Sequence, residues 1–354
     1  MFCGCATARN KAPIFGLYDV PVEAFAEVKE AGFDLVTGPS KAEFLDAAAE
    51  SKLKVLMSSS ALSGDASKIN RELTNFDRHR AAWGWYLIDE PDLHDLPPDR
   101  VEFVTQRFQR RAQKPGVIVL RSGASAKTYG EDCDLLMVDF YPVPWAPVAR
   151  FAKEMRLASF ARGAKPYFGV VQAFDWSHFP EMLGQTNDLR APTIAEIRCM
   201  AYMALALEAR GLFFYSYKAG TWSLPASPLW PELKSLVKEL RAASPLFAHP
   251  PRWAPSEIEY HGPMYNEVHD GVMLSRLYHL ARPAKNFSAG YYYLVINTTP
   301  ETVSYDFRVP FAAESVRHAN ESIALEDRWL RRRYQPYEVA IFGPLQKPLF
   351  ESAK

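Results

Sequence analysis

Cysteine is scarce in this sequence, since its 354 residues contain only Cys3, Cys5, Cys133 and Cys199. So few cysteines cannot supply the disulfide framework of a small secreted fold. Cys133 and Cys199 adjoin apolar runs, and we expect both to be small buried side chains. No run approaches the ~18 apolar residues of a transmembrane helix, so we expect no membrane span.

Several motifs that carry cofactors or nucleophiles are also missing. No G-x-G-x-x-G or G-x-x-x-x-G-K loop follows a predicted strand, which argues against a nucleotide-binding sheet. The eight histidines show no H-x-H or H-E-x-x-H spacing, so we expect no zinc site. A G-x-S-x-G motif is absent too, which argues against an α/β-hydrolase. The sequence therefore predicts neither a metal nor a cofactor.

The chain has no excess of charge of either sign. Lys plus Arg and Asp plus Glu both number 41, which gives a formal net charge of zero. A nucleic-acid-binding protein usually shows a basic excess or a basic stripe. The short run Arg331 to Arg333 is interpreted as a solvated turn or strand end. We therefore expect no nucleic-acid partner.

Residues 1–11 allow two interpretations. The start, Met-Phe-Cys-Gly-Cys-Ala, resembles the tail of a bacterial lipoprotein signal, in which a Gly precedes the lipidated Cys. The charged start and apolar run of a complete signal are missing. Either the chain begins inside a longer signal with Cys5 as the lipid anchor, at the cell envelope or outside the cell, or these residues are the frayed tail of a cytoplasmic protein.

Aromatic residues, in contrast, are plentiful at 13% of the chain. Sugars pack their C–H faces on aromatic rings, but such rings also fill large cores, so composition leaves both roles open. Apolar residues make up 48% and charged residues 23%, as in ordinary soluble globular proteins. The length exceeds the ~250 to 300 residues over which one core grows, which predicts two domains.

The first two-thirds of the chain alternate short apolar runs with helical patterns. Such alternation predicts a parallel sheet covered by helices, and eight units over about 235 residues favour a closed (β/α)₈ barrel, residues 12–247. The expected strands are 14–18, 33–37, 54–57, 83–88, 116–120, 135–138, 167–171 and 212–217, and the expected helices are 21–31, 41–51, 65–82, 98–111, 147–161, 194–209 and 232–243.

The pattern changes near Ser244 and Pro245, and the proline-rich stretch 250–255 indicates a linker. Strand-like runs follow, separated by a turn signal at 297–300. We expect residues 250–354 to form an antiparallel β-sandwich. The expected strands are 271–280, 291–296, 303–309 and 337–341.

The chemistry of such a barrel belongs at the C-terminal ends of its strands. The most informative strand end is Asp89-Glu90-Pro91-Asp92, which directly follows an apolar run. Neighbouring like charge and apolar walls raise a carboxyl pKa, which suits a general acid. Glu90 is our candidate for that role. The alternative is that these carboxylates only cap or pair with neighbouring groups.

Residues 84–92 resemble the GWYL-x-DEPD strand of glycoside-hydrolase-like barrels, which are related to the retaining clan that includes β-galactosidases and cellulases. Residues 134–144 are similar to the sixth-strand segment of these proteins. Residues 166–174 resemble the seventh strand, and residues 192–203 and 211–217 resemble the helix and strand that follow. The resemblance covers roughly residues 13–245 and implies a barrel that acts on carbohydrate.

In that clan the Glu that ends the fourth strand is the acid/base, which here falls on Glu90. The residue before it is typically Asn, whereas this chain has Asp89. The clan's nucleophile is a Glu at the end of the seventh strand, and the matching position is Gln172, which carries no carboxylate. The resemblance therefore leaves the second catalytic group open.

Another carboxylate can complete the pair. Asp139 ends the sixth strand and is our first choice, with Asp89, Asp19 and Asp175 as further candidates. A separation from Glu90 of about 5 to 5.5 Å indicates retention of configuration, and roughly 6.5 to 9.5 Å indicates inversion. The alternative for Asp139 is a hydrogen bond that anchors the following loop.

Other side chains near the strand ends can bind substrate. Arg121 and Lys218 together would accept an anionic sugar such as a uronic acid, and Gln172 can bind hydroxyl groups. The candidate sugar platforms, each with core packing as its alternative, are Tyr141, Trp145, Trp176, Tyr217 and Trp222.

The sequence thus predicts a glycoside hydrolase that uses two carboxylates and no cofactor. The alternative is a non-catalytic carbohydrate-binding or envelope-assembly protein on a degenerate barrel, which Gln172 favours, because a fold alone does not establish activity.

Overall fold

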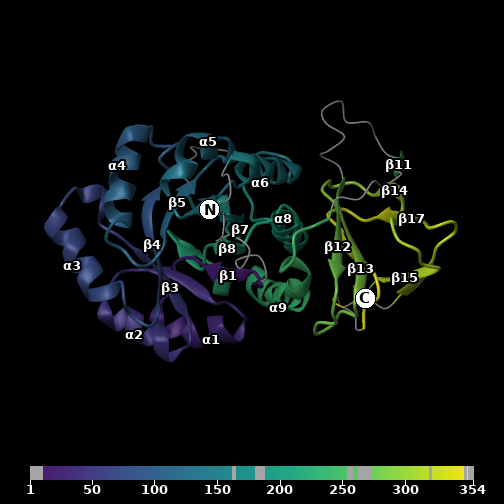
Figure 1. Cartoon of the computed structure of the whole chain (residues 1–354), viewed down its shortest axis with the longest axis horizontal. Helices are drawn as coiled ribbons and strands as arrows, with labels where there is room; N and C mark the ends of the chain where they lie inside the picture. The colour runs from purple at the N-terminus through teal and green to yellow at the C-terminus, as the bar shows by residue number, and fades with distance from the viewer. Residues whose placement is uncertain are drawn as a thin grey trace, which may run out of the picture.

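The computed structural model describes residues 11–161, 165–179, 188–252, 258–261, 273–318, 321–346 and 349. Within them, a closed barrel of eight parallel strands is followed by antiparallel sheets (Figure 1). The predicted (β/α)₈ barrel with a C-terminal antiparallel β domain is therefore confirmed. Cys3 and Cys5, and with them the proposed lipid anchor, lie outside the described residues.

The barrel closes where β8 pairs with β1. Its strands are β1 (Ile14–Leu17), β2 (Leu35–Gly38), β3 (Lys54–Ser58), β4 (Ala82–Asp89), β5 (Gly116–Leu120), β6 (Leu135–Val138), β7 (Tyr167–Gln172) and β8 (Gly211–Tyr215). The helices around it are α1 (Phe25–Glu30), α2 (Ala42–Glu50), α3 (Ala66–Phe76), α4 (Pro98–Gln109), α5 (Ala126–Tyr129), α6 (Ala149–Ala161), α8 (Ile194–Ala206) and α9 (Leu229–Phe247).

The third helix, α3, ends at Phe76, whereas the sequence pattern predicts that it continues to residue 82. The next residue, Asp77, is buried and accepts hydrogen bonds from the Trp85 indole Nε1 at 2.8 Å and the Gln113 backbone N–H at 2.6 Å. These bonds fix the chain entering β4, so Ala82 joins the strand instead of the helix.

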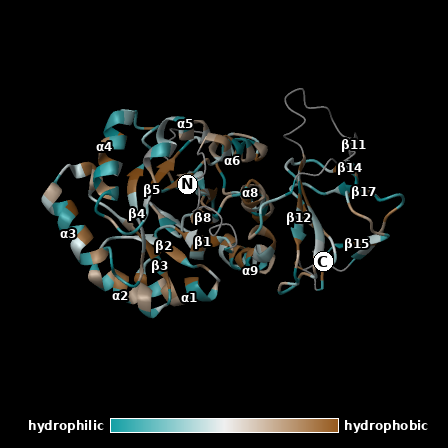
Figure 2. Ribbon diagram, in the orientation of Figure 1, coloured by the Kyte–Doolittle hydropathy of each residue, from teal (hydrophilic) through white to brown (hydrophobic). Residues whose placement is uncertain are grey.

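Side chains fill the barrel interior, so a ligand can bind only at the end of the barrel. Leu56, Val119, Met137 and Phe213 belong to the buried interior cluster. Gly16 makes room for the Phe213 ring, since a Cβ at that position would lie 2.4 Å from it. Hydrophobic residues, brown in Figure 2, run along β4 and β5. The barrel is therefore a packed core and not a channel.

The β domain contains two three-stranded antiparallel sheets, and residues from both form one apolar core between them. The first sheet is β12 (Met273–Leu280), β13 (Gly290–Asn297) and β18 (Val339–Phe342), and the second is β11 (Ile258–His261), β14 (Val303–Arg308) and β17 (Trp329–Tyr334). A hairpin of β15 (Ser315–His318) and β16 (Glu321–Ala324) completes the part described.

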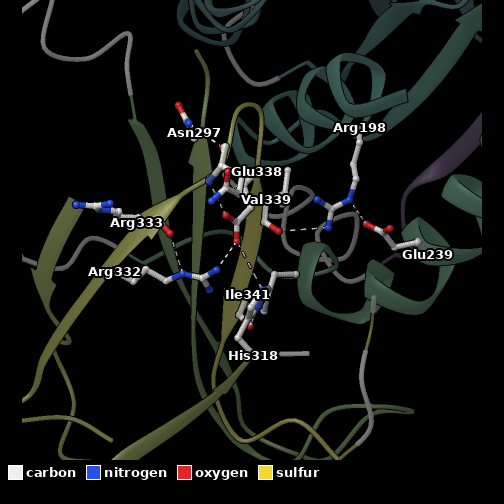
Figure 3. Close-up of polar contacts among 10 residues, drawn as sticks. Arg198, Glu239, Asn297, His318, Arg332, Arg333, Glu338, Val339 and Ile341 are labelled. Atoms are coloured by element: carbon white, nitrogen blue, oxygen red, sulfur yellow. Dashed lines mark hydrogen bonds and ion pairs between the residues drawn. The ribbon is translucent and has the colours of Figure 1, made fainter. Parts of the chain in front are cut away.

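The basic run, interpreted above as a solvated turn or strand end, lies within β17. Arg331 donates to Glu326 at 2.9 Å. Arg332 donates to Glu338 at 2.7 Å (Figure 3). Its guanidinium lies over the Tyr334 ring. The run therefore lies inside a strand and not at a turn or strand end, and the two ion pairs neutralise part of its charge.

The first sheet of the β domain is buried on both faces. Along β13, Tyr293 and Val295 face the second sheet, whereas Leu294 and Ile296 join the apolar cluster of the barrel. On β12, the Tyr278 ring lies edge-on to Phe247 of α9, with centroids 5.6 Å apart. Antiparallel sheets commonly expose one face to water. This sheet is instead the middle layer between the barrel helices and the second sheet.

A polar contact reinforces this interface (Figure 3). Arg198 of α8 donates to Glu239 of α9 at 2.7 Å and to the Val339 carbonyl of β18 at 3.2 Å. One guanidinium therefore joins two barrel helices to the β domain.

We expect the barrel and the β domain to unfold in a single transition because they share this apolar core. Leu294→Ala should lower the free energy of unfolding by about 2–5 kcal/mol. In urea titrations, fluorescence from the barrel tryptophans should shift together with far-ultraviolet circular dichroism. Leu62→Ala, at an exposed leucine of the barrel, should change little. Two separate transitions in the Leu294→Ala variant would contradict the shared core.

Candidate active site

A cavity of about 650 Å³ opens at the C-terminal ends of the barrel strands. Its lining side chains come from β4 and from the segments that follow β4, β5, β6 and β7. Tyr18, just after β1, and Tyr215, at the end of β8, also line it. The residues that line it are Tyr18, Tyr86, Asp89, Glu90, Leu93, Arg121, Asp139, Phe140, Tyr141, Trp145, Ala146, Phe174, Trp176, Phe179 and Tyr215.

Glu90 follows β4 directly and is held by its backbone. Its N–H donates to the Val119 carbonyl of β5 at 3.0 Å, and its φ of 39° turns the chain away from the strand. Its side chain lines the cavity. Burial and then the charges of Asp89 and Asp92 raise the pKa of Glu90 above its usual value, while Arg121 acts in the opposite direction. Such a shift favours the protonated acid.

The two aspartates beside Glu90 have partners of their own. Asp89 accepts a hydrogen bond from the Tyr86 hydroxyl at 2.5 Å. Asp92 accepts from the backbone N–H groups of Arg121 at 3.1 Å and Ser122 at 3.0 Å, which ties the loop after β4 to the loop after β5. Both aspartates are therefore positioned by hydrogen bonds around the end of β4.

Asp139 follows β6 and lies deeper in the cavity, with 8% of its surface exposed. Its N–H donates to the Leu120 carbonyl at 3.0 Å. Within the described residues, its Oδ1 atom is buried and has no hydrogen-bond partner. Burial, followed by the charges of Glu90 and Asp89, raises the pKa of Asp139 well above its usual value. An unpaired buried carboxylate oxygen costs free energy that a bound ligand or water can recover.

Three tyrosines surround these carboxylates. The Tyr18 ring lies edge-on to Tyr86 and to Tyr215, with centroid distances of 6.2 and 5.3 Å. Burial and then the charges of Asp19, Asp89, Asp139 and Glu90 raise the pKa of Tyr215 to about 12. Its hydroxyl therefore stays protonated and can donate to a substrate oxygen at the centre of the acidic cluster.

Asp19 ends β1 beside the cavity but does not line it. Its φ is 56°, and its N–H donates to the Thr37 hydroxyl at 3.0 Å. Burial and the charge of Asp89 raise the pKa of Asp19 to about 6. Asp19 therefore contributes to the electrostatic potential at the mouth of the barrel, although it does not line the cavity.

Aromatic rings form the opposite wall. Tyr141 stacks on Tyr215, with centroids 5.7 Å apart and planes at 26°. Trp145 and Trp176 lie edge-to-face at 6.5 Å, and Trp176 also contacts Phe174 at 4.8 Å. Trp145 is 48% exposed at the rim. An exposed indole beside a cavity of this size offers a flat apolar surface to a sugar ring.

Gln172 is fully buried, and its side chain serves the backbone instead of the cavity. Its amide nitrogen donates to the Val143 carbonyl at 2.8 Å, and its amide oxygen accepts from the Val143 N–H at 3.0 Å. It thereby holds the loop after β6, which carries Tyr141 and Trp145. Both of its polar atoms are engaged, so the structure offers no sugar-binding role for this amide.

Four other candidates also lie outside the cavity lining. Asp175 accepts from the Ser177 N–H at 2.8 Å and so caps a short helical turn. Tyr217 packs edge-on to Trp230, and the Trp222 indole donates to the Ser216 carbonyl at 3.1 Å. Lys218 is exposed on β9 (Lys218–Ala219). Of the two cations proposed for an anionic sugar, Arg121 alone lines the cavity.

Eight lining residues were not predicted from the sequence: Tyr18, Tyr86, Leu93, Phe140, Ala146, Phe174, Phe179 and Tyr215. Tyr18 and Tyr215 lie at strand ends, so the rule that selected the carboxylates could have found them. Tyr86 could not be found this way, because β4 pairs irregularly with both neighbours. Trp83 and Tyr86 both point inward while Trp85 points outward, which strict alternation does not predict.

Within the described residues, no group of three or more His, Cys, Asp or Glu side chains is arranged to hold a metal ion. No helix in the same part of the chain is long and apolar enough to cross a membrane.

No family model matches the chain, and a comparison with curated proteins finds no match. Among solved structures, it is similar to a family 5 glycoside hydrolase from Bacteroides vulgatus, at 10% identity over 97% of this chain and 92% of the other, with a TM-score of 0.59. An α-amylase from Anoxybacillus gives 11% identity over 97% and 99% of the two chains, with a TM-score of 0.55.

A β-galactosidase from Bacillus circulans gives 10% identity over 67% of this chain and 57% of the other, with a TM-score of 0.51. The chain spans less than two thirds of the length of the β-galactosidases that it matches. At these identities the likeness concerns the fold, and it shows that this chain has a glycoside-hydrolase-like (β/α)₈ barrel.

Proposed function

We propose that this protein hydrolyses a glycosidic bond with Glu90 and Asp139 as its carboxylate pair. The observation that carries the proposal is that these two side chains, from the ends of β4 and β6, line one cavity with a wall of exposed and half-buried aromatic rings. The likeness of the barrel to glycoside hydrolases supports the same reaction class.

In the proposed reaction, Glu90 donates its proton to the glycosidic oxygen as the bond from that oxygen to the anomeric carbon breaks. A water molecule attacks the anomeric carbon and gives its proton to Asp139. Asp89 adds a negative charge that stabilises the positively charged sugar in the transition state. Trp145 and Trp176 provide the surface on which the sugar packs. Two carboxyl groups and a water molecule suffice, so the reaction requires no cofactor.

The division of roles rests on position. Glu90 is the more open of the two carboxyls and lies nearer to the mouth, where a leaving group would exit, while Asp139 lies deeper. The pKa values of both groups are raised, that of Asp139 further because it is more deeply buried. Both shifts favour a proton shared by the pair, and the proposed reaction uses the form in which that proton is on Glu90.

A second function from a different class is binding of carbohydrate without hydrolysis. It is favoured by Gln172, which stands where the clan's nucleophile is expected and is taken up by two hydrogen bonds to Val143. A role in envelope assembly, through a lipid anchor at Cys5, belongs to this alternative.

Substrates that differ in leaving group separate the two roles. Glu90→Gln should reduce hydrolysis of glycosides with poor alkyl leaving groups by about 10²–10⁴-fold, and hydrolysis of dinitrophenyl glycosides far less, because a dinitrophenolate leaves without protonation. Asp139→Asn should slow both substrates equally. Initial rates over a panel of glycosides measure these ratios.

The reverse pattern would make Asp139 the acid. Equal turnover by wild type and Glu90→Gln would end the proposed role of Glu90, and binding of glycans without turnover of any glycoside would favour the non-catalytic alternative. The matched control is Glu43→Gln, at an exposed residue of α2, which should leave every rate unchanged.

The pH profile should follow the charges around Glu90. The proposed active form has Glu90 protonated and Asp139 ionised. On the alkaline side kcat/KM should therefore be lost as that proton leaves, at a pH set by the raised pKa of Glu90, and on the acid side it should be lost as Asp139 also takes up a proton. Asp89→Asn removes a charge that raises this pKa, so the alkaline limb should move to lower pH. Arg121→Gln removes a charge that lowers it, so the limb should move to higher pH. Shifts in the same direction for both variants would contradict this assignment.

A further inference from the structure

The cavity holds one more carboxylate than the acid–base pair of the proposed reaction. Asp89, Glu90 and Asp139 line it, and among the described residues Arg121 is the single cation that does so. Even with one carboxyl protonated, two negative charges face one positive charge. Asp19 adds a further carboxylate beside the mouth, and the nearby charge of Asp89 helps to raise the pKa of Asp19. The cavity is therefore electronegative.

Two details show that this charge is directed at the cavity. The Tyr86 hydroxyl, 2.5 Å from Asp89 Oδ1, fixes that carboxylate at the cavity wall. Asp139, whose Oδ1 atom is buried without a partner in the described residues, lines the same cavity. Asp89 is exposed, so its charge is within reach of a ligand bound in the cavity.

We propose that the sugar bound here carries an ammonium group, so that the substrate is a glycoside of an amino sugar. This inference rests on the proposed function and specifies its substrate class. Asp89 is the partner of the ammonium, since Glu90 and Asp139 serve the bond that is cleaved. The ammonium supplies three N–H donors to an oxygen-lined wall.

Charge decides between sugar classes. The attraction of an ammonium to a carboxylate is several times stronger beside a protein wall than in bulk water. A neutral sugar meets the excess charge only in the positively charged transition state, whereas an ammonium is attracted in the bound substrate as well. A uronic acid would add another carboxylate to the cluster, and Lys218, which could have offset it, lies outside the cavity lining. The cavity therefore favours cationic over neutral sugars and neutral over anionic sugars.

The test compares four nitrophenyl glycosides, each as both anomers: the glucosaminide, its N-acetylated form, the glucoside and the glucuronide. We expect kcat/KM for the glucosaminide to exceed that for the glucoside at least tenfold, which is about 1.4 kcal/mol. N-acetylation removes the positive charge and should abolish this advantage. The advantage should also shrink as salt is added, because salt screens the attraction.

Asp89→Asn should bring the ratio of glucosaminide to glucoside turnover close to one. The matched control is Asp327→Asn, at an exposed position of the β domain with a φ of 49°, a conformation that Asn tolerates. This control should keep the wild-type ratio. Equal or greater turnover of the glucoside or glucuronide, dependent on Glu90, would overturn the amino-sugar inference and leave the proposed hydrolysis intact.

Ligand binding separates the failure of the two proposals. Trp145 and Trp176 line the cavity, so their fluorescence should respond when glucosamine, glucose or glucuronate binds to the full chain. If no glycoside is hydrolysed but glucosamine binds at least tenfold more tightly than glucose, the proposed function fails and the preference for a cationic sugar stands. If glucosamine binds no more tightly than glucose, the inference is wrong.

Discussion

Pairing of β8 with β1 is the constraint on which the site depends, because it closes the sheet and directs the ends of all eight strands to one mouth. Glu90 and Asp139 are 49 positions apart in the sequence, yet each follows a strand of the same barrel and each is anchored through its backbone to the neighbouring strand. Closure brings like charges together in a poorly hydrated place, where burial and mutual repulsion raise the pKa values of both carboxyls.

The same closure explains why apolar packing and polar chemistry occupy different levels of the barrel. Aliphatic and aromatic side chains fill the interior below the mouth. The tyrosines form the boundary: the Tyr18 ring packs against Phe213 and Tyr86, and the Tyr86 hydroxyl donates to Asp89. An amphipathic side chain suits such a boundary, since it contributes to the core and to the hydrogen bonding of the site together.

The fold could be predicted from the sequence because alternating apolar runs and helical patterns extend over some 235 residues and admit few architectures. The position of Glu90 followed from the same periodicity, since a strand end is a local feature. The role of Gln172 could not be predicted, because its partner is the backbone of Val143, a loop residue placed by another strand. The inward position of Tyr86 could not be predicted, because β4 pairs irregularly with both of its neighbours. The burial of β13 on both faces could not be predicted either, because it depends on helices far away in sequence.

The two hydrogen bonds between Gln172 and Val143 also bear on how the cavity receives a ligand. They clamp the segment that carries Tyr141 and Trp145 to the end of β7, so these rings need no ordering when a sugar arrives. Binding to a preorganised surface avoids the loss of conformational entropy that a loose loop would suffer. Gln172 thus makes the neighbouring wall a rigid template for the shape of the ligand.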